Sequence, residues 1–145
     1  MSDTAPVDGV SLARLPPLRL FLVEDSAMVR ELMMESFATI PGITFAGFSD
    51  SEDDAFAQLQ HAPCDIVIVD IQLRQGNGIS LLRRLAIQPG VAAPIHIILS
   101  NNVSAAYRSI LDQINSCFFF DKTTEFSQLH TLLQQLGTGV EVPKK

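Results

Sequence analysis

Residues 65–73 read DIVIVDIQL, in which four β-branched aliphatic residues lie between two aspartates. A short unbroken apolar run of this kind is typical of a strand buried in the core of a sheet. Asp65 is an ordinary residue at the start of such a strand. Asp70 is less ordinary, because it places a carboxylate where the chain leaves the core. This stretch therefore predicts both a central strand and a polar site at its end.

Outward from this strand, apolar runs alternate with segments whose apolar residues recur at helical spacing. The predicted strands are 18–25, 43–48, 65–70, 94–100 and 117–121. The predicted helices are 26–40, 51–62, 78–88, 104–114 and 124–136. This alternation predicts an α/β fold, a (βα)5 doubly wound three-layer sandwich whose parallel five-stranded sheet has the flavodoxin-like order 2-1-3-4-5.

The 145 residues suffice for one domain with its own core. We expect a flexible leader at 1–17, a domain at 18–137, and a flexible tail at 138–145 with no output domain. The net charge of −6 argues against nonspecific attraction to nucleic acid or to anionic membranes. No apolar run approaches the ~20 residues of a membrane helix, and a cytoplasmic protein is expected.

Polar residues follow the ends of the predicted strands, and the carboxyl ends of parallel strands meet at one edge of the sheet. Glu24 and Asp25 end the first strand, Asp70 the third, Ser100 the fourth, and Lys122 follows the fifth. If the first and third strands are neighbours, their carboxylates converge. Carboxylates held together favour a hard divalent cation, and oxygen ligands suit Mg²⁺.

The same edge offers what a phosphoryl group needs. A cation, the Lys122 ammonium and the Ser100 hydroxyl would form a cradle for a transferring phosphoryl group. A carboxylate can itself act as the nucleophile and form an acyl phosphate. Each residue alone has an ordinary structural explanation, such as capping of a helix by Glu24 or a solvated Lys122. Their conjunction at one edge predicts that Asp70 is phosphorylated.

The motifs LVEDS, IVIVDIQLRQGNGISLLRRL, IILSNN and FFFDKTTEF together resemble the receiver domain of bacterial two-component response regulators, most of all the stand-alone, chemotaxis-regulator-like kind. The resemblance covers about residues 18–137. It implies that Asp70 accepts a phosphoryl group from a sensor histidine kinase or a phosphotransfer protein. It also implies bound Mg²⁺, or Mn²⁺, with Asp25 as a direct ligand, Glu24 acting through water, and further oxygens from Asp70 and the Gln72 backbone carbonyl.

The resemblance assigns the remaining site residues as well. Lys122 would pair with the phosphoryl oxygens, and Gly78 matches the glycine that opens the third helix. Ser100 would be the hydroxyl that turns toward the phosphate, and Phe119 the ring that follows it. Period two in FFF would send Phe118 and Phe120 to the opposite face of the sheet from Phe119.

Two departures from the family pattern concern the loops around the site. Arg74 stands where a proline is common after the acceptor, so this loop is expected to be more mobile. Thr123 follows Lys122 where many receivers have a cis proline, so a trans bond is expected. Thr123 or Thr124 could then cap the last helix.

The resemblance implies a signalling switch whose output is protein binding, to an effector protein or a downstream relay partner, with no direct DNA binding and no membrane partner. A homodimer through the fourth helix, fifth strand and fifth helix is possible. The chain is not expected to be an enzyme, beyond assisting its own phosphotransfer and dephosphorylation.

Two alternatives stay open: a non-phosphorylated pseudo-receiver that binds partners, and an aspartyl-nucleophile Mg²⁺-dependent phosphatase. Gln72 argues against the phosphatase, which commonly has a second aspartate there. Arg83 and Arg84 are expected to be solvated, and the three histidines to have structural or surface roles.

Overall fold

The computed structural model describes residues 16–87, 95–101 and 117–139. Its strands are β1 (Leu18–Val23), β2 (Ile43–Ser49), β3 (Ile66–Val69), β4 (Ile95–Ser100) and β5 (Cys117–Asp121). Its helices are α1 (Ala27–Phe37), α2 (Glu52–His61), α3 (Gly78–Ala86) and α5 (Phe126–Gly137). The helix predicted at 104–114 lies outside the described residues, as do positions 1–15 of the predicted leader and 140–145 of the predicted tail.

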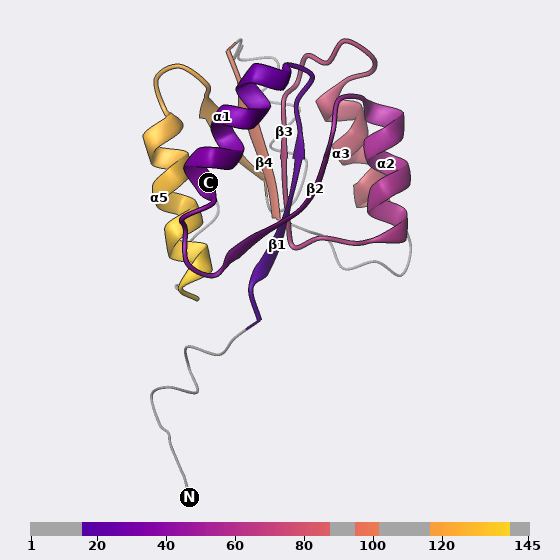
Figure 1. The fold of residues 1–145 in the computed structure, drawn as a ribbon. Coiled ribbons are helices and arrows are strands. Elements are labelled where there is room, and N and C mark those ends of the chain that lie inside the picture. Colours follow the sequence, from indigo (N-terminus) through magenta and orange to yellow (C-terminus); the bar gives the residue numbers. More distant parts are fainter. Residues whose placement is uncertain (1–15, 88–94, 102–116, 140–145) are drawn as a thin grey trace, which may run out of the picture.

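The five strands form one parallel sheet in the order β2-β1-β3-β4-β5. The helices α1 and α5 cover one face of this sheet, and α2 and α3 cover the other (Figure 1). This arrangement confirms the predicted doubly wound three-layer fold and its strand order. Because β1 and β3 are neighbours, with Val23 paired to Val69, the residues that follow these two strands emerge side by side.

The alternation of side chains along β3 explains its unbroken apolar run. Ile66 and Ile68 belong to the core cluster beneath α1 and α5, whereas Val67 and Val69 belong to the cluster beneath α2 and α3. Both faces of the strand are dry, so both positions of the pleat need aliphatic residues. The FFF run of β5 follows the same rule: Phe118 and Phe120 lie in the first cluster and Phe119 in the second, as predicted.

Polar residues fix the starts of the first three helices. Ser26 Oγ accepts a hydrogen bond from the Val29 amide at 3.3 Å, and Ser51 Oγ accepts one from Asp54 at the same distance. Asn77 Oδ1 accepts from the Ile79 amide at 2.7 Å at the start of α3. Such caps satisfy amides that lack a partner within the helix. No helix in the described ranges is long and apolar enough to span a membrane.

The prediction that Thr123 or Thr124 caps the last helix is wrong. The residue at the N-cap of α5 is Glu125, which makes no side-chain cap hydrogen bond. The amides of Thr123 and Thr124 donate instead to Asp121 Oδ1, at 2.8 and 3.0 Å. Hydrogen bonds from the Thr123 hydroxyl and from these two amides lower the pKa of Asp121 to about 2. The Lys122–Thr123 bond is trans, as expected.

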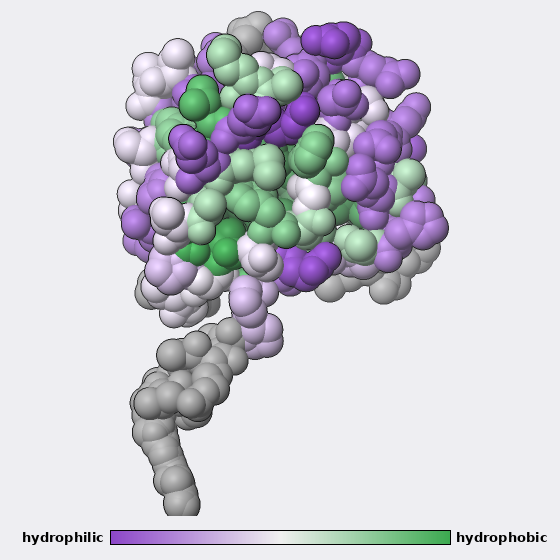
Figure 2. All heavy atoms as spheres, in the orientation of Figure 1, coloured by the Kyte–Doolittle hydropathy of each residue, from purple (hydrophilic) through white to green (hydrophobic). Residues whose placement is uncertain are grey.

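The edge strand β2 contributes an apolar surface of its own. Figure 2 shows hydrophobic residues gathered over the middle of the face on which β2 lies, with polar residues around them. Phe48, near the end of β2, is 46% exposed, and the Arg30 guanidinium lies 4.5 Å from the centre of its ring. On the neighbouring helix α1, Met28 and Leu32 are also exposed. The carboxyl edge of the sheet is therefore bordered by apolar as well as charged residues.

Candidate functional site

A lysine and two carboxylates from three different strands meet at the carboxyl edge of the sheet. Lys122 Nζ lies 2.7 Å from Glu24 Oε1 and 2.8 Å from Asp70 Oδ2. Glu24 is 1% exposed, and its Oε1 makes no other polar contact within the described ranges, so the ion pair compensates for its burial. Burial alone would lower the pKa of Lys122, but the hydrogen bonds and charges of Asp70 and Glu24 outweigh it and raise the pKa. Lys122 is therefore held in its charged form between the two carboxylates.

The loop that follows β3 contributes two backbone amides to this site. The Gln72 amide donates to Asp70 Oδ1 at 3.2 Å, and the Arg74 amide donates to Asp25 Oδ2 at 2.6 Å. The loop thus contacts carboxylates from β3 and from the end of β1. The Arg74 amide is bound by Asp25 in this structure, and the greater mobility expected of this loop stays a prediction.

Gly78 is placed against the backbone of Asp70. A Cβ atom built on Gly78 would lie 2.3 Å from the Asp70 carbonyl oxygen, closer than side-chain carbons approach such an atom. The Gly78 amide also donates to the Ile71 carbonyl at 2.9 Å. A glycine is therefore required where α3 starts, because any side chain would push the helix away from Asp70.

Ser100 and Phe119 occupy the strands next to Asp70. Ser100 is 2% exposed at the end of β4, and its carbonyl accepts the Lys122 amide at 3.1 Å. Phe119 is 8% exposed and lies opposite Ile98, on the face of the sheet covered by α2 and α3. The backbone thus links the predicted switch serine directly to Lys122.

The side chains at this edge match a hard cation in chemistry but do not converge around one point. Carboxylate oxygens are the ligands that Mg²⁺ prefers. Within the described residues, however, no group of three or more His, Cys, Asp or Glu side chains is arranged to hold a metal ion. Lys122 is paired with Glu24 and Asp70, and Asp25 is bonded to the Arg74 amide. A divalent cation would share these carboxylates with the Lys122 ammonium and the Arg74 amide.

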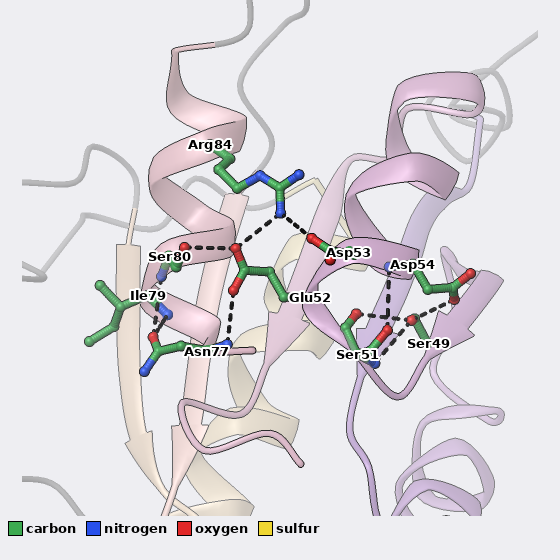
Figure 3. Close-up of polar contacts among 9 residues, drawn as sticks. All are labelled: Ser49, Ser51, Glu52, Asp53, Asp54, Asn77, Ile79, Ser80 and Arg84. Atoms are coloured by element: carbon green, nitrogen blue, oxygen red, sulfur yellow. Dashed lines mark hydrogen bonds and ion pairs between the residues drawn. The ribbon is translucent and has the colours of Figure 1, made fainter. Parts of the chain in front are cut away.

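A second polar cluster, which the sequence did not reveal, joins α2 to α3 and to the loop between β3 and α3 (Figure 3). Glu52 Oε1 accepts from the Asn77 amide at 3.0 Å. Its Oε2 accepts from Ser80 Oγ at 2.7 Å and from Arg84 at 3.0 Å. Partial burial alone would raise the pKa of Glu52, but the hydrogen bonds from Ser80, Arg84 and Asn77 lower it. Glu52 is therefore an ionised acceptor.

Arg84 extends this cluster to the exposed Asp53, with a distance of 2.9 Å between the charged atoms, and its guanidinium lies 4.0 Å from the ring centre of Phe56. Arg84 is 35% exposed, which fits the expectation that it is solvated, and the structure adds specific partners that the sequence did not indicate. In the sequence, Glu52 looked like an ordinary acidic residue in the first turn of a helix. Its partners are 25 to 32 residues away, so no local pattern could identify its role.

Comparison with known proteins identifies the family. The family model described as "Response regulator receiver domain" matches residues 20–134, and the chain belongs to this family. A protein-glutamate methylesterase/protein-glutamine glutaminase from Treponema denticola is 27% identical over 124 residues, which are 83% of this chain and 33% of that protein. One from Anaeromyxobacter dehalogenans is 29% identical over 90 residues, 62% of this chain and 24% of that protein. The chain thus spans a quarter to a third of the length of these relatives.

Solved structures share the fold. A LuxR-family response regulator from Aurantimonas superposes with a TM-score of 0.75 at 20% identity, covering 88% of this chain and 90% of that one. The response regulator domain of CheB from Thermotoga maritima gives a TM-score of 0.69 at 20% identity, covering 87% and 99%. The Mn²⁺-bound form of the response regulator Rcp1 superposes with a TM-score of 0.69 at 19% identity, covering 88% of this chain and 99% of that one. At these identities the likeness establishes the fold.

Proposed function

We propose that the chain is a phosphorylation-dependent signalling switch in which Asp70 accepts a phosphoryl group from a histidine kinase or a phosphotransfer protein. The observation that carries this proposal is the placement of Lys122 Nζ 2.8 Å from Asp70 Oδ2 and 2.7 Å from Glu24 Oε1. A charged lysine beside the acceptor can stabilise negative charge that develops on transferring phosphoryl oxygens.

In the transfer step, a carboxylate oxygen of Asp70 forms a bond to phosphorus while the bond between phosphorus and the donor nitrogen breaks. The phosphohistidine donor leaves as histidine, and Asp70 becomes an acyl phosphate. Asp70 is partly exposed, so a donor can reach it. As the phosphoryl group arrives, Lys122 can exchange its contact with the carboxylate for one with a phosphoryl oxygen.

We propose that the same edge binds Mg²⁺, or Mn²⁺, through Asp25, Glu24, Asp70 and the backbone carbonyl of Gln72. The oxygen chemistry of these groups supports the proposal, as does the Mn²⁺-bound relative Rcp1. A bound divalent cation would neutralise charge on the carboxylates and on the phosphoryl oxygens. An ionised carboxylate has about four lone-pair sites. Asp25 could therefore bind the cation and still accept the Arg74 amide, which is an exposed contact.

The output of the switch is proposed to be protein binding. A phosphoryl dianion at Asp70 offers acceptors to the Ser100 hydroxyl, and Phe119 on the adjacent strand can follow into the vacated space. This change would alter the surface around β5 and α5, where an effector, a relay partner or a second copy could bind. The net charge of −6 supports protein rather than direct DNA contacts. We propose a cytoplasmic location, where a histidine kinase or phosphotransfer protein would supply the phosphoryl group.

No separate enzymatic activity is proposed, because the chain matches only part of its methylesterase relatives. The alternative of a pseudo-receiver, which binds partners without phosphorylation, predicts the same fold but an unreactive Asp70. Pairing of Asp70 with a charged lysine favours the reactive form.

Incubation with acetyl phosphate and Mg²⁺, followed by intact-protein mass measurement, tests the proposal. One phosphoryl group should be added with Mg²⁺ and none when the metal is chelated. Asp25→Asn should reduce the rate, whereas Asp50→Asn, a control that follows the edge strand β2, should not. Addition that is independent of the metal would contradict the metal assignment, and no addition to the wild type would favour the pseudo-receiver.

A further inference from the structure

The part of the β3–α3 loop that precedes α3 is fastened to α2 through one residue, Glu52. Glu52 Oε1 accepts the Asn77 amide at 3.0 Å, and the Glu52 amide donates to the Gln75 carbonyl at 3.1 Å. Between them, Gly76 has a φ of +93°, and a Cβ atom built there would lie 2.3 Å from the Cβ of Glu52. Three consecutive loop residues therefore pack directly on Glu52.

The two ends of this loop are also held to each other. The Gly78 amide donates to the Ile71 carbonyl, and Gly78 packs against the Asp70 backbone. An isolated bridge between Gln72 and Asn77 closes the loop across its base. The loop is thus a short closed turn, and it is attached to Glu52 through Asn77, to Ser51 through an isolated bridge with Gln75, and to Asp25 through the Arg74 amide.

Two residues of this loop carry the amides that contact the site. Gln72 donates to Asp70 Oδ1 and Arg74 donates to Asp25 Oδ2. Both carboxylates therefore take their orientation partly from the loop. Neither Gln72 nor Arg74 is buried, so packing of their own side chains contributes little to holding them there.

We propose that Glu52 is a positioning residue for phosphoryl transfer: its carboxylate accepts the Asn77 amide and so holds the loop whose Gln72 and Arg74 amides orient the Asp70 and Asp25 carboxylates. This inference rests on the proposed function of Asp70. The group that matters is the acceptor oxygen facing Asn77, rather than the ion pair with Arg84. The ion pair joins α2 to α3, and Arg84 has a second carboxylate partner in Asp53.

Substitutions can separate the two roles. Glu52→Ala removes both the acceptor and the ion pair. Glu52→Gln keeps an acceptor for the Asn77 amide and can donate to Ser80 Oγ, but it cannot pair with Arg84. Asp53→Ala is the matched control, because Asp53 is an exposed neighbour that shares Arg84 and makes no contact with the loop among the described hydrogen bonds and ion pairs.

Two measurements apply to each variant: amide hydrogen exchange of residues 74–78, and the initial rate of phosphorylation by acetyl phosphate. In Glu52→Ala the Asn77 amide should exchange at least about tenfold faster, as expected for loss of a charge-assisted hydrogen bond. Phosphorylation should slow by about 10- to 100-fold, the range for a misplaced reacting group. In Glu52→Gln both values should return to within about threefold of wild type, and Asp53→Ala should match wild type.

Other outcomes overturn the inference. If Glu52→Ala is phosphorylated at the wild-type rate, Glu52 does not position the site. If Glu52→Gln is as slow as Glu52→Ala and Asp53→Ala is slowed too, the cluster acts as a structural ion pair. If Glu52→Ala does not fold, Glu52→Gln decides the question. A slow rate with the Asn77 amide still protected, or a wild-type rate with that amide unprotected, would separate the rate from the loop contact and overturn the inference. If the wild type accepts no phosphoryl group, the proposed function fails, and amide exchange alone decides whether Glu52 holds the loop.

Discussion

Lys122 Nζ lies 2.8 Å from Asp70 Oδ2, so the residue after β5 reaches across β4 to the residue after β3. The same ammonium group is 2.7 Å from Glu24 Oε1 at the end of β1. Three strand ends are therefore joined by one positive charge. This contact has consequences for stability as well as for the proposed chemistry.

Replacing this charge should destabilise the fold. In Lys122→Met, the buried Glu24 and its neighbour Asp70 lose their compensating charge, and we expect a loss on the order of 3 kcal/mol in the free energy of unfolding at pH 7. Urea denaturation measures it. The exposed Arg83→Met should change stability by less than about 0.5 kcal/mol, and an equal loss in both variants would contradict the role given to Lys122.

The contact between Gly78 and the Asp70 backbone predicts a steric effect. In Gly78→Ala the new Cβ would lie 2.3 Å from the Asp70 carbonyl oxygen, which is backbone and cannot swing away. We expect a loss of about 2 kcal/mol or more and disturbed amide chemical shifts at Asp70 and Ile71. Gly47→Ala is the comparison, since its nearest neighbour is the movable ring of Phe21 at 3.2 Å. Equal tolerance of both alanines would show that α3 can shift without cost.

His96 predicts a pH dependence of stability. It is 1% exposed in β4, and neither ring nitrogen has a hydrogen-bond partner within the described residues. Burial lowers the pKa of His96 from 6.5 to about 4. Between these two values the unfolded chain binds a proton that the folded chain does not, so acid favours unfolding in this window. The stability that neutral His96 provides is complete above pH 6.5 and falls as the pH drops toward 4.

The expected loss from this one group is about 3 kcal/mol across the window. His96→Leu should remove that part of the slope in urea denaturation series between pH 7 and pH 4, whereas the exposed His61→Leu should keep it. A slope in His96→Leu identical to that of the wild type would mean that His96 is protonated in the folded protein.

The sequence predicted the features that depend on local pattern. The apolar run of β3 and the alternation of strands and helices were enough for the layer architecture and the strand order, because a buried parallel sheet restricts both. The caps Ser26 and Ser51 are local in the same way, because each hydroxyl oxygen is only three residues from the amide whose hydrogen bond it accepts. The convergence of Glu24, Asp70 and Lys122 followed from the rule that strand ends meet at one edge.

Features that depend on distant contacts were not predicted. Asp121, rather than a threonine, accepts the amides before α5, since several polar residues compete for the same donors there. The role of Glu52 depends on Asn77, Ser80 and Arg84, which only the packing of α2 against α3 brings near. The hydrogen bond between Asp25 and the Arg74 amide likewise spans 49 residues and joins two loops.

The most direct test of the account is to locate the phosphoryl group. The chain is treated with acetyl phosphate and Mg²⁺ and reduced with borohydride, which converts an aspartyl phosphate to homoserine, and peptide fragmentation then finds the altered position. Asp70→Asn and an untreated sample are the controls, with a known receiver labelled in parallel. We predict homoserine at position 70 in the wild type and at no position in either control. Homoserine elsewhere, or none while the known receiver is labelled, would contradict the assignment of Asp70 as the phosphoacceptor.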